Sequence, residues 1–92
     1  MRIFDIGEVV RVRSSEDIVK ICWQLSISPP HPNLLEFISG KCVKISDVFK
    51  DYLNHVIYYT EEELRVGNQR LLFLYSEFVE EILSNKMTFY PG

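Results

Sequence analysis

The segment that most constrains the fold is an alternating stretch near the N-terminus, residues 6–13. In an extended chain Val10 and Val12 point to one side and Arg11 and Arg13 to the other, which is typical of a strand with one buried face. A glycine at the entry to such a stretch often marks a backbone conformation that other residues resist. We therefore expect residues 6–13 to form the first strand of a small β-rich domain.

A helix is expected directly after this strand. Ser14 stands three residues before Asp17, a spacing similar to a capping box, and acidic residues favour the positive N-terminal end of a helix. Four apolar residues then fall at positions i, i+3, i+4 and i+7 and form one stripe: Ile18, Ile21, Cys22 and Leu25. Three prolines within residues 29–32 end this helix. A short helical turn is expected at residues 34–38, with Gly40 as its C-cap.

Two more strands are expected at residues 41–49 and 55–60, because β-branched and aromatic residues are frequent in both. A hairpin with a long charged tip follows and turns at Gly67 and Asn68. Residues 71–83 are ambiguous. Their apolar spacing favours a helix, whereas a strand, a tight turn and a second short strand fit the same residues. Periodicity alone leaves both alternatives open.

Taken in order, these segments resemble the small SH3-like barrel proteins of bacteria and bacteriophages. In that family a hydrophobic-Gly-acid start leads into a short helix, Gly-Lys opens the next strand, an aromatic strand follows, and an acid-hydrophobic-Glu-x-Ile stretch closes the chain. The matching segments are residues 6–12, 15–18, 40–41, 56–59 and 77–82. The resemblance implies a mainly β fold, an SH3-like five-stranded small barrel with one helix inserted after strand 1 and packed across the barrel. It also favours strand, turn and strand within residues 71–83, and it brings no catalytic residues.

Residues 1–92 are expected to be a single SH3-like domain, whose tail, residues 83–92, either docks on the domain or stays mobile. In such a barrel Leu71, Phe73 and Tyr75 would fill the interior. The outward side chains would then form an apolar patch made of Leu72, Leu74, Ile57 and Tyr59. Soluble monomers rarely expose such a patch, so we expect the apolar stripe of the helix to cover it.

Charge and composition narrow the function classes. The net charge is −3 and the pI about 5.3, so the field of the whole molecule repels nucleic acid and anionic membranes. No apolar run approaches the roughly 20 residues of a membrane helix, and the N-terminus lacks the apolar core of a signal peptide. Two cysteines, Cys22 and Cys42, suggest reduced thiols rather than a disulfide framework. We therefore expect a cytoplasmic protein without membrane contact.

No catalytic or metal site is expected. The four residues that could ligate zinc, His31, His55, Cys22 and Cys42, contain no close pair at ligand spacing. The glycines are too far apart for a phosphate-binding loop, and the spacing of the many acidic residues marks no pair as buried. We expect a chain that is not an enzyme and that uses no cofactor.

The candidate binding residues are aromatic and acidic. Tyrosine and tryptophan anchor interfaces with little entropy to lose, and a carboxylate surface can occupy a basic site on another protein. These partner-binding candidates are Trp23, Tyr52, His55, Tyr59, Glu61, Glu62 and Glu63. Trp23 has a second interpretation, because it could instead be a flank of the helix that covers the barrel.

The expected function is a non-enzymatic protein-interaction module of a bacterium or phage. It would act as a small inhibitor or adaptor through the acidic and aromatic surface, or would assemble with itself as a homodimer. One alternative is a nucleic-acid-binding small barrel, whose candidate residues are Arg11, Arg13, Lys41 and Lys44. Another alternative is an accessory subunit of an enzyme.

Overall fold

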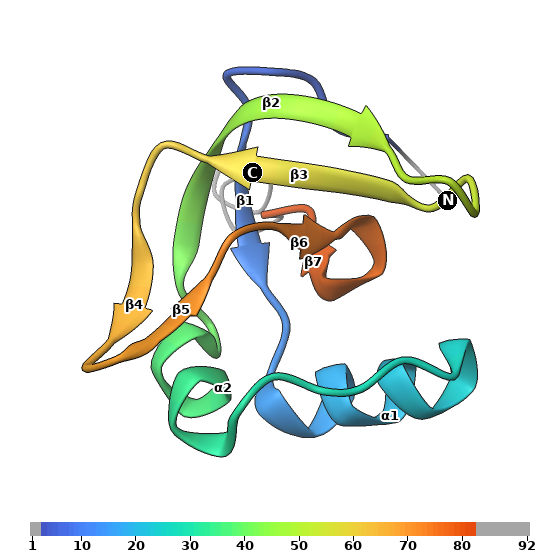
Figure 1. Cartoon of the computed structure of the whole chain (residues 1–92). Helices are drawn as coiled ribbons and strands as arrows, with labels where there is room; N and C mark the ends of the chain where they lie inside the picture. The colour runs from blue at the N-terminus through green and yellow to red at the C-terminus, as the bar shows by residue number, and fades with distance from the viewer. Residues whose placement is uncertain (1–2, 83–92) are drawn as a thin grey trace, which may run out of the picture.

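Seven antiparallel strands, two α-helices and one 3₁₀ helix make up residues 3–82, the part of the chain that the structure, a computed structural model, describes (Figure 1). In chain order the elements are β1 (Val9–Val12), α1 (Ser15–Leu25), α2 (Pro32–Ile38), β2 (Cys42–Lys50), β3 (Val56–Thr60), β4 (Leu64–Val66), β5 (Gln69–Leu71), β6 (Leu74–Tyr75), η1 (Ser76–Phe78) and β7 (Val79–Glu80). Five strands form one sheet in the order β6-β3-β2-β1-β7, and β4 pairs with β5 in a separate hairpin. The mainly β class is therefore confirmed. The tail predicted at residues 83–92 lies outside the described residues.

Strand β1 is shorter than the predicted residues 6–13, since it covers Val9–Val12, but it has the predicted alternation. Val10 and Val12 are fully buried, whereas Arg11 is exposed. Gly7 precedes the strand with a φ of +91°, a conformation that favours glycine, and its N–H donates a 2.7 Å hydrogen bond to the carbonyl of Ile45. The turn into β1 is thus fixed to β2 before the two strands begin to pair.

The helix predicted after β1 is confirmed as α1. The Ser14 hydroxyl accepts a 3.2 Å hydrogen bond from the N–H of Asp17 and so caps the helix. Two residues of the apolar stripe, Ile18 and Cys22, are fully buried in the core. The helix ends at Leu25, ahead of the proline-rich residues, as predicted.

Helix α2 replaces the short turn predicted at residues 34–38. It begins two residues earlier, at Pro32, whose fixed φ suits the first turn of a helix. His31 caps this helix, because its imidazole Nδ1 accepts a hydrogen bond from the N–H of Asn33. Gly40 lies just beyond the helix with a φ of +74°, as expected of a C-terminal glycine. Both helices therefore lie between β1 and β2 in the chain.

Strand β2 contributes to two parts of the sheet. It is long and curved in Figure 1: its first residues pair with β1 and its later residues pair with β3. The register shifts between Ile45 and Asp47, so Ser46 is a bulge. A bulge reverses which residues of a strand face the core. After it Val48 packs against the core, and Asp47 and Phe49 point to the opposite side of the sheet.

The ambiguous C-terminal segment forms strand, turn and strand as far as residue 82, so the helix alternative is wrong. Strand β6 pairs with β3, η1 makes a tight turn, and β7 pairs with β1. The single strand predicted at residues 70–75 is interrupted, because residues 72–73 separate β5 from β6. The apolar spacing resembles that of a helix because η1 brings Phe78 and Val79 into the same core as Leu74.

The predicted division of this segment between interior and exterior is confirmed for Leu72 and wrong for Leu74. Leu74 is fully buried, Leu72 is 63% exposed, and Tyr75 is only partly buried. The irregular residues 72–73 reset the alternation between β5 and β6. Helix α1 packs mainly against α2 and η1, so its apolar stripe covers the core rather than the outer face of β3. Of the patch that the helix was expected to cover, Leu72 and Tyr59 stay exposed, whereas Leu74 and Ile57 are buried.

Candidate interaction surface

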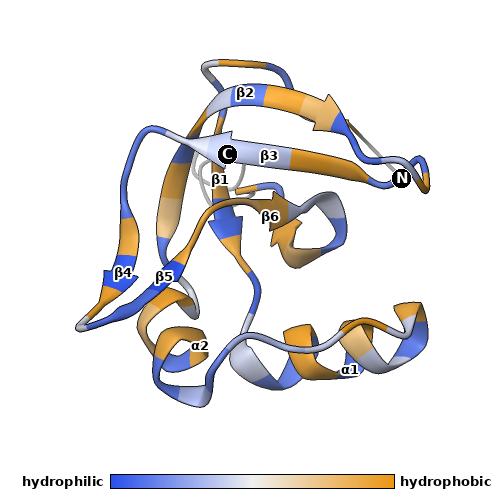
Figure 2. Ribbon diagram, in the orientation of Figure 1, coloured by the Kyte–Doolittle hydropathy of each residue, from blue (hydrophilic) through white to orange (hydrophobic). Residues whose placement is uncertain are grey.

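A row of apolar side chains lies on the side of β2, β3 and β6 that faces away from the core. The strand register places Phe49 opposite Ile57, and Ile57 opposite Tyr75. Tyr59 is two residues further along β3 and so shares that side. Phe73, in the irregular stretch before β6, joins the row through its ring contacts with Tyr59 and Tyr75. Figure 2 shows apolar residues on the adjoining ends of β2 and β3 and on β6. We call these five residues the aromatic face.

The rings of the aromatic face contact one another in a chain. The ring of Tyr59 meets Phe49 edge-on at a centroid distance of 5.1 Å, and it stacks on Phe73 at 6.5 Å with 16° between the planes. Phe73 meets Tyr75 edge-on at 5.5 Å, and Tyr75 meets Phe78 of η1 at 5.4 Å. Each such pair contributes about 0.5–1.5 kcal/mol beyond its burial. The aromatic face is therefore a packed unit rather than a set of independent side chains.

Ile57 is buried within this unit, which joins the main core at its Tyr75 end. It is only 8% exposed, yet it does not belong to the main core, and its register neighbours are Phe49 and Tyr75. The outer part of the row is open, since Phe49 is 46% exposed and Tyr59 is 41% exposed. An antiparallel sheet usually carries polar residues on its water-facing side. An open aromatic cluster in this position is typical of a binding surface.

The turn between β2 and β3 extends the aromatic face with a fixed tip. Asp51 organises the turn, because its Oδ1 accepts hydrogen bonds from the N–H groups of Leu53 and His55, both at 2.9 Å. Asn54 completes the turn with a φ of +67°. Tyr52 stands at the tip and is 93% exposed. Tyr52 is one of the residues predicted to bind a partner.

His55 lies between the turn and the aromatic face. Its ring meets Tyr75 edge-on at 5.7 Å, and its Nδ1 lies 3.5 Å from Asp51 Oδ2. That Nδ1 is buried and makes no hydrogen bond in the described part of the chain. Burial raises the pKa of the Tyr75 phenol, and the nearby carboxylates of Asp51 and Glu77 raise it further. The structure thus brings His55 and Tyr59, two predicted binding residues, to the two ends of one surface.

The predicted acidic residues line a groove of about 330 Å³ that begins at Tyr59. Its other walls come from β3, β4 and β5, and the lining residues are Ser46, Tyr59, Thr60, Glu61, Glu62, Glu63, Leu64, Arg70, Leu71 and Leu72. Glu61 Oε2 lies 3.8 Å from Lys44 Nζ, and Glu63 Oε1 lies 3.8 Å from Arg70 Nε. Glu62 accepts a 3.0 Å hydrogen bond from the backbone N–H of Lys44. Neighbouring cations therefore balance part of the acidic charge.

Trp23 is separate from this surface. It is 78% exposed on α1, so the interpretation that it covers the barrel is wrong. It borders a different hollow together with Ile27 and Pro29. Because α1 packs mainly against α2 and η1, Trp23 does not extend the aromatic face.

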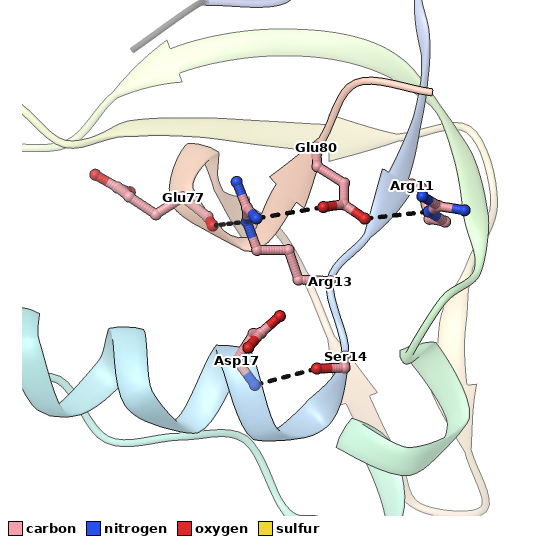
Figure 3. Close-up of polar contacts among 6 residues, drawn as sticks. All are labelled: Arg11, Arg13, Ser14, Asp17, Glu77 and Glu80. Atoms are coloured by element: carbon pink, nitrogen blue, oxygen red, sulfur yellow. Dashed lines mark hydrogen bonds and ion pairs between the residues drawn. The ribbon is translucent and has the colours of Figure 1, made fainter. Parts of the chain in front are cut away.

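The predicted basic patch is largely neutralised by contacts within the chain. Figure 3 shows Glu80 between two arginines: Arg11 Nε lies 3.1 Å from one of its oxygens, and Arg13 lies 3.3 Å from the other. Arg13 Nε also donates to the backbone carbonyl of Glu77 at 3.0 Å. Lys41 Nζ lies 4.4 Å above the ring of Phe37, and Lys44 pairs with an acidic residue as described above. The four basic candidates are therefore engaged with internal partners.

The two thiols differ in exposure. Cys22 is buried and Cys42 is exposed, and both are free. Burial raises the pKa of the Cys22 thiol. Within residues 3–82 no three His, Cys, Asp or Glu side chains gather as a metal site would require, and no helix there is long and apolar enough to cross a membrane.

Sequence reasoning missed four of the five members of the aromatic face as binding residues. These are Phe49, Ile57, Phe73 and Tyr75, although the aromatic content of the chain is high. The side on which Phe49 lies depends on the bulge at Ser46, and the side for Tyr75 depends on the break at residues 72–73. The prediction assumed a regular alternation, which places neither Phe49 nor Tyr75 on the correct side of the sheet.

Comparison with protein-family models, with curated proteins and with solved structures finds no significant match to this chain. A proposal about function must therefore rest on the geometry of the surface.

Proposed function

We propose that this chain is a non-enzymatic protein-interaction module, which binds a segment of another protein on the aromatic face. The module would serve as a small inhibitor or adaptor in a bacterium or phage. The proposal includes the finer architecture, an SH3-like small barrel. The sheet order β6-β3-β2-β1-β7, the curved β2 and the 3₁₀ turn that joins the two edge strands support a barrel.

One observation carries the functional proposal: the aromatic face is open. Phe49 and Tyr59 keep more than a third of their surface in water, although the rest of the row already buries Ile57. Exposed apolar surface of this kind favours association, since each Å² removed from water contributes about 25 cal/mol. Tyrosine and phenylalanine in a packed row lose little entropy when a partner binds. A partner segment laid along β3 would complete a cluster that the chain itself leaves unfinished.

Neighbouring features suit the same role. The turn that carries Tyr52 is held by the carboxylate of Asp51, so its tip is presented in one conformation. The groove beside Tyr59 continues the surface past the end of β3. Together the tip, the aromatic face and the groove form one continuous strip from the β2–β3 turn to β5.

The experiment that tests this proposal is a selection from a displayed random-peptide library on the immobilised chain. Enriched peptides are then measured by fluorescence anisotropy against the wild type, Tyr59→Ser and Trp23→Ser. Trp23 is the matched control, because it is an exposed aromatic residue outside the aromatic face. We expect the Tyr59→Ser variant to bind about tenfold or more weakly and the Trp23→Ser variant to bind like the wild type. The proposal is contradicted if no peptide is enriched, or if the Tyr59→Ser variant binds the enriched peptides as tightly as the wild type does.

A further inference from the structure

We infer that the end of the aromatic face around Tyr59 receives an arginine side chain of the bound partner segment. This inference rests on the proposed function and names the chemistry of the partner. The position is where the aromatic face meets the acidic groove, so it combines an exposed ring with carboxylates.

The ring of Tyr59 supplies one half of the site. Phe73 stacks on it and Phe49 meets it edge-on, so both neighbours fix its orientation. The side chain nevertheless remains 41% exposed, which leaves part of the ring open to a ligand. A guanidinium placed over a tyrosine ring gains a cation–π attraction, and arginine is the cation most often found in such contacts.

Carboxylates without cationic partners supply the other half. Asp47 is the register neighbour of Tyr59 on β2, and the bulge at Ser46 puts it on the same side of the sheet. Its only hydrogen bond within residues 3–82 comes from the N–H of Val48, at 3.3 Å. In that same range Glu62 accepts from a backbone N–H and pairs with no lysine or arginine side chain. Asp47 thus lies beside Tyr59 in the strand register, and Glu62 lines the groove that begins at Tyr59.

The groove adds charge complementarity and an apolar wall. Its lining contains three glutamates against one arginine. Arg65 lies 3.4 Å from Glu63, and Lys44 and Arg70 lie 3.8 Å from Glu61 and Glu63. Exposed pairs of this kind contribute only about 0–1 kcal/mol each. They can be displaced at little cost. Leu71 and the 63%-exposed Leu72 offer apolar contact to the residue that follows the arginine.

The same chemistry separates arginine from lysine. A planar guanidinium stacks on a ring with its face while its edge donates to carboxylates on both sides. The compact ammonium of lysine cannot do both at once. We therefore expect arginine to be preferred over lysine, and both over a neutral residue of similar length.

The inference is tested with N-acetylarginine amide as the probe, titrated into the isotope-labelled chain and followed by NMR. N-acetyllysine amide and N-acetylglutamine amide serve as matched probes. We expect saturable shifts of the Tyr59 ring and of Asp47, with arginine binding about three- to tenfold tighter than lysine and glutamine giving no saturable shift. In the Asp47→Asn/Glu62→Gln double variant the arginine probe should bind at least about fivefold more weakly. The control variant is Glu16→Gln, because Glu16 is an exposed acidic residue that lies on α1.

Two results would overturn the inference. Either the glutamine probe shifts the same resonances as strongly as the arginine probe, or the double variant binds arginine as well as the wild type does. If library peptides still bind in a Tyr59-dependent way, neither result contradicts the proposed function. Conversely, a library that yields no Tyr59-dependent peptide contradicts the proposed function independently of these titrations.

Discussion

The backbone N–H of Phe4 donates a 2.9 Å hydrogen bond to the hydroxyl of Tyr58, which lies 54 residues away in the chain. The two rings also meet edge-on at a centroid distance of 6.2 Å. Tyr58 is fully buried on the inner side of β3, next in sequence to the outward Tyr59. The inner face of β3 therefore ties the N-terminal segment to the core, while its outer face carries the exposed Tyr59.

Removing this hydroxyl should weaken the fold. In Tyr58→Phe the N–H of Phe4 would lose its acceptor inside the protein, which costs about 1–3 kcal/mol of unfolding free energy. Urea denaturation of both proteins measures this difference. Tyr52→Phe is the control, because Tyr52 is 93% exposed and should leave the midpoint unchanged. Equal midpoints for Tyr58→Phe and the wild type would contradict the assignment.

The cap of α1 can be tested separately. Ser14→Ala removes the hydroxyl that accepts from the N–H of Asp17 and should cost about 1 kcal/mol. Ser14→Asp keeps an acceptor at the same place and should restore most of the loss. If alanine and aspartate gave the same urea midpoint, the side chain of Ser14 would have no capping role.

Stability should fall at alkaline pH through Tyr75. Its pKa is higher in the folded chain than in the unfolded chain, so the folded state keeps the phenol proton longer. The stabilising contribution is fully present below the ordinary tyrosine value of about 10, and it declines as the pH rises from there through the folded pKa. Unfolding free energies at increasing pH should therefore drop more steeply for the wild type than for Tyr75→Phe. Parallel curves would show that the surroundings of Tyr75 do not favour the neutral phenol.

The two thiols should react at very different rates. Cys42 is exposed, whereas Cys22 is buried and its pKa is raised. The reagent therefore reaches Cys22 poorly, and less of the Cys22 thiol is in the reactive thiolate form. Mass spectrometry after brief treatment with iodoacetamide near neutral pH should find one adduct, at Cys42. In denaturant both cysteines should be modified. Modification of Cys22 in the native chain at the rate of Cys42 would contradict the burial of its side chain in the core.

Local patterns were enough to predict the elements whose cause is local. The valines and arginines of β1, the serine cap of α1 and the prolines after it act within a few residues, and each was predicted correctly. Residues 71–83 show the opposite case. Their helical spacing is overridden because β6 and β7 find partners in β3 and β1, which are distant in sequence.

The candidate site was predicted only in part for the same reason. Tyr59 and His55 were identified from their residue types, and the structure places both along the aromatic face. Phe49 and Asp47 reach that face only because the bulge at Ser46 changes the side of the sheet to which they point. Trp23 shows the limit of residue type alone, since its position on α1 separates it from the other aromatic residues.

The most direct test of the binding surface is an NMR titration of the isotope-labelled chain with a peptide from the library selection. The account predicts that the largest shifts fall on the five residues of the aromatic face and at Asp47, with little change on α1 and α2. Shifts concentrated on α1 and α2, or on β1 around Arg11 and Arg13, with Tyr59 unmoved, would contradict it.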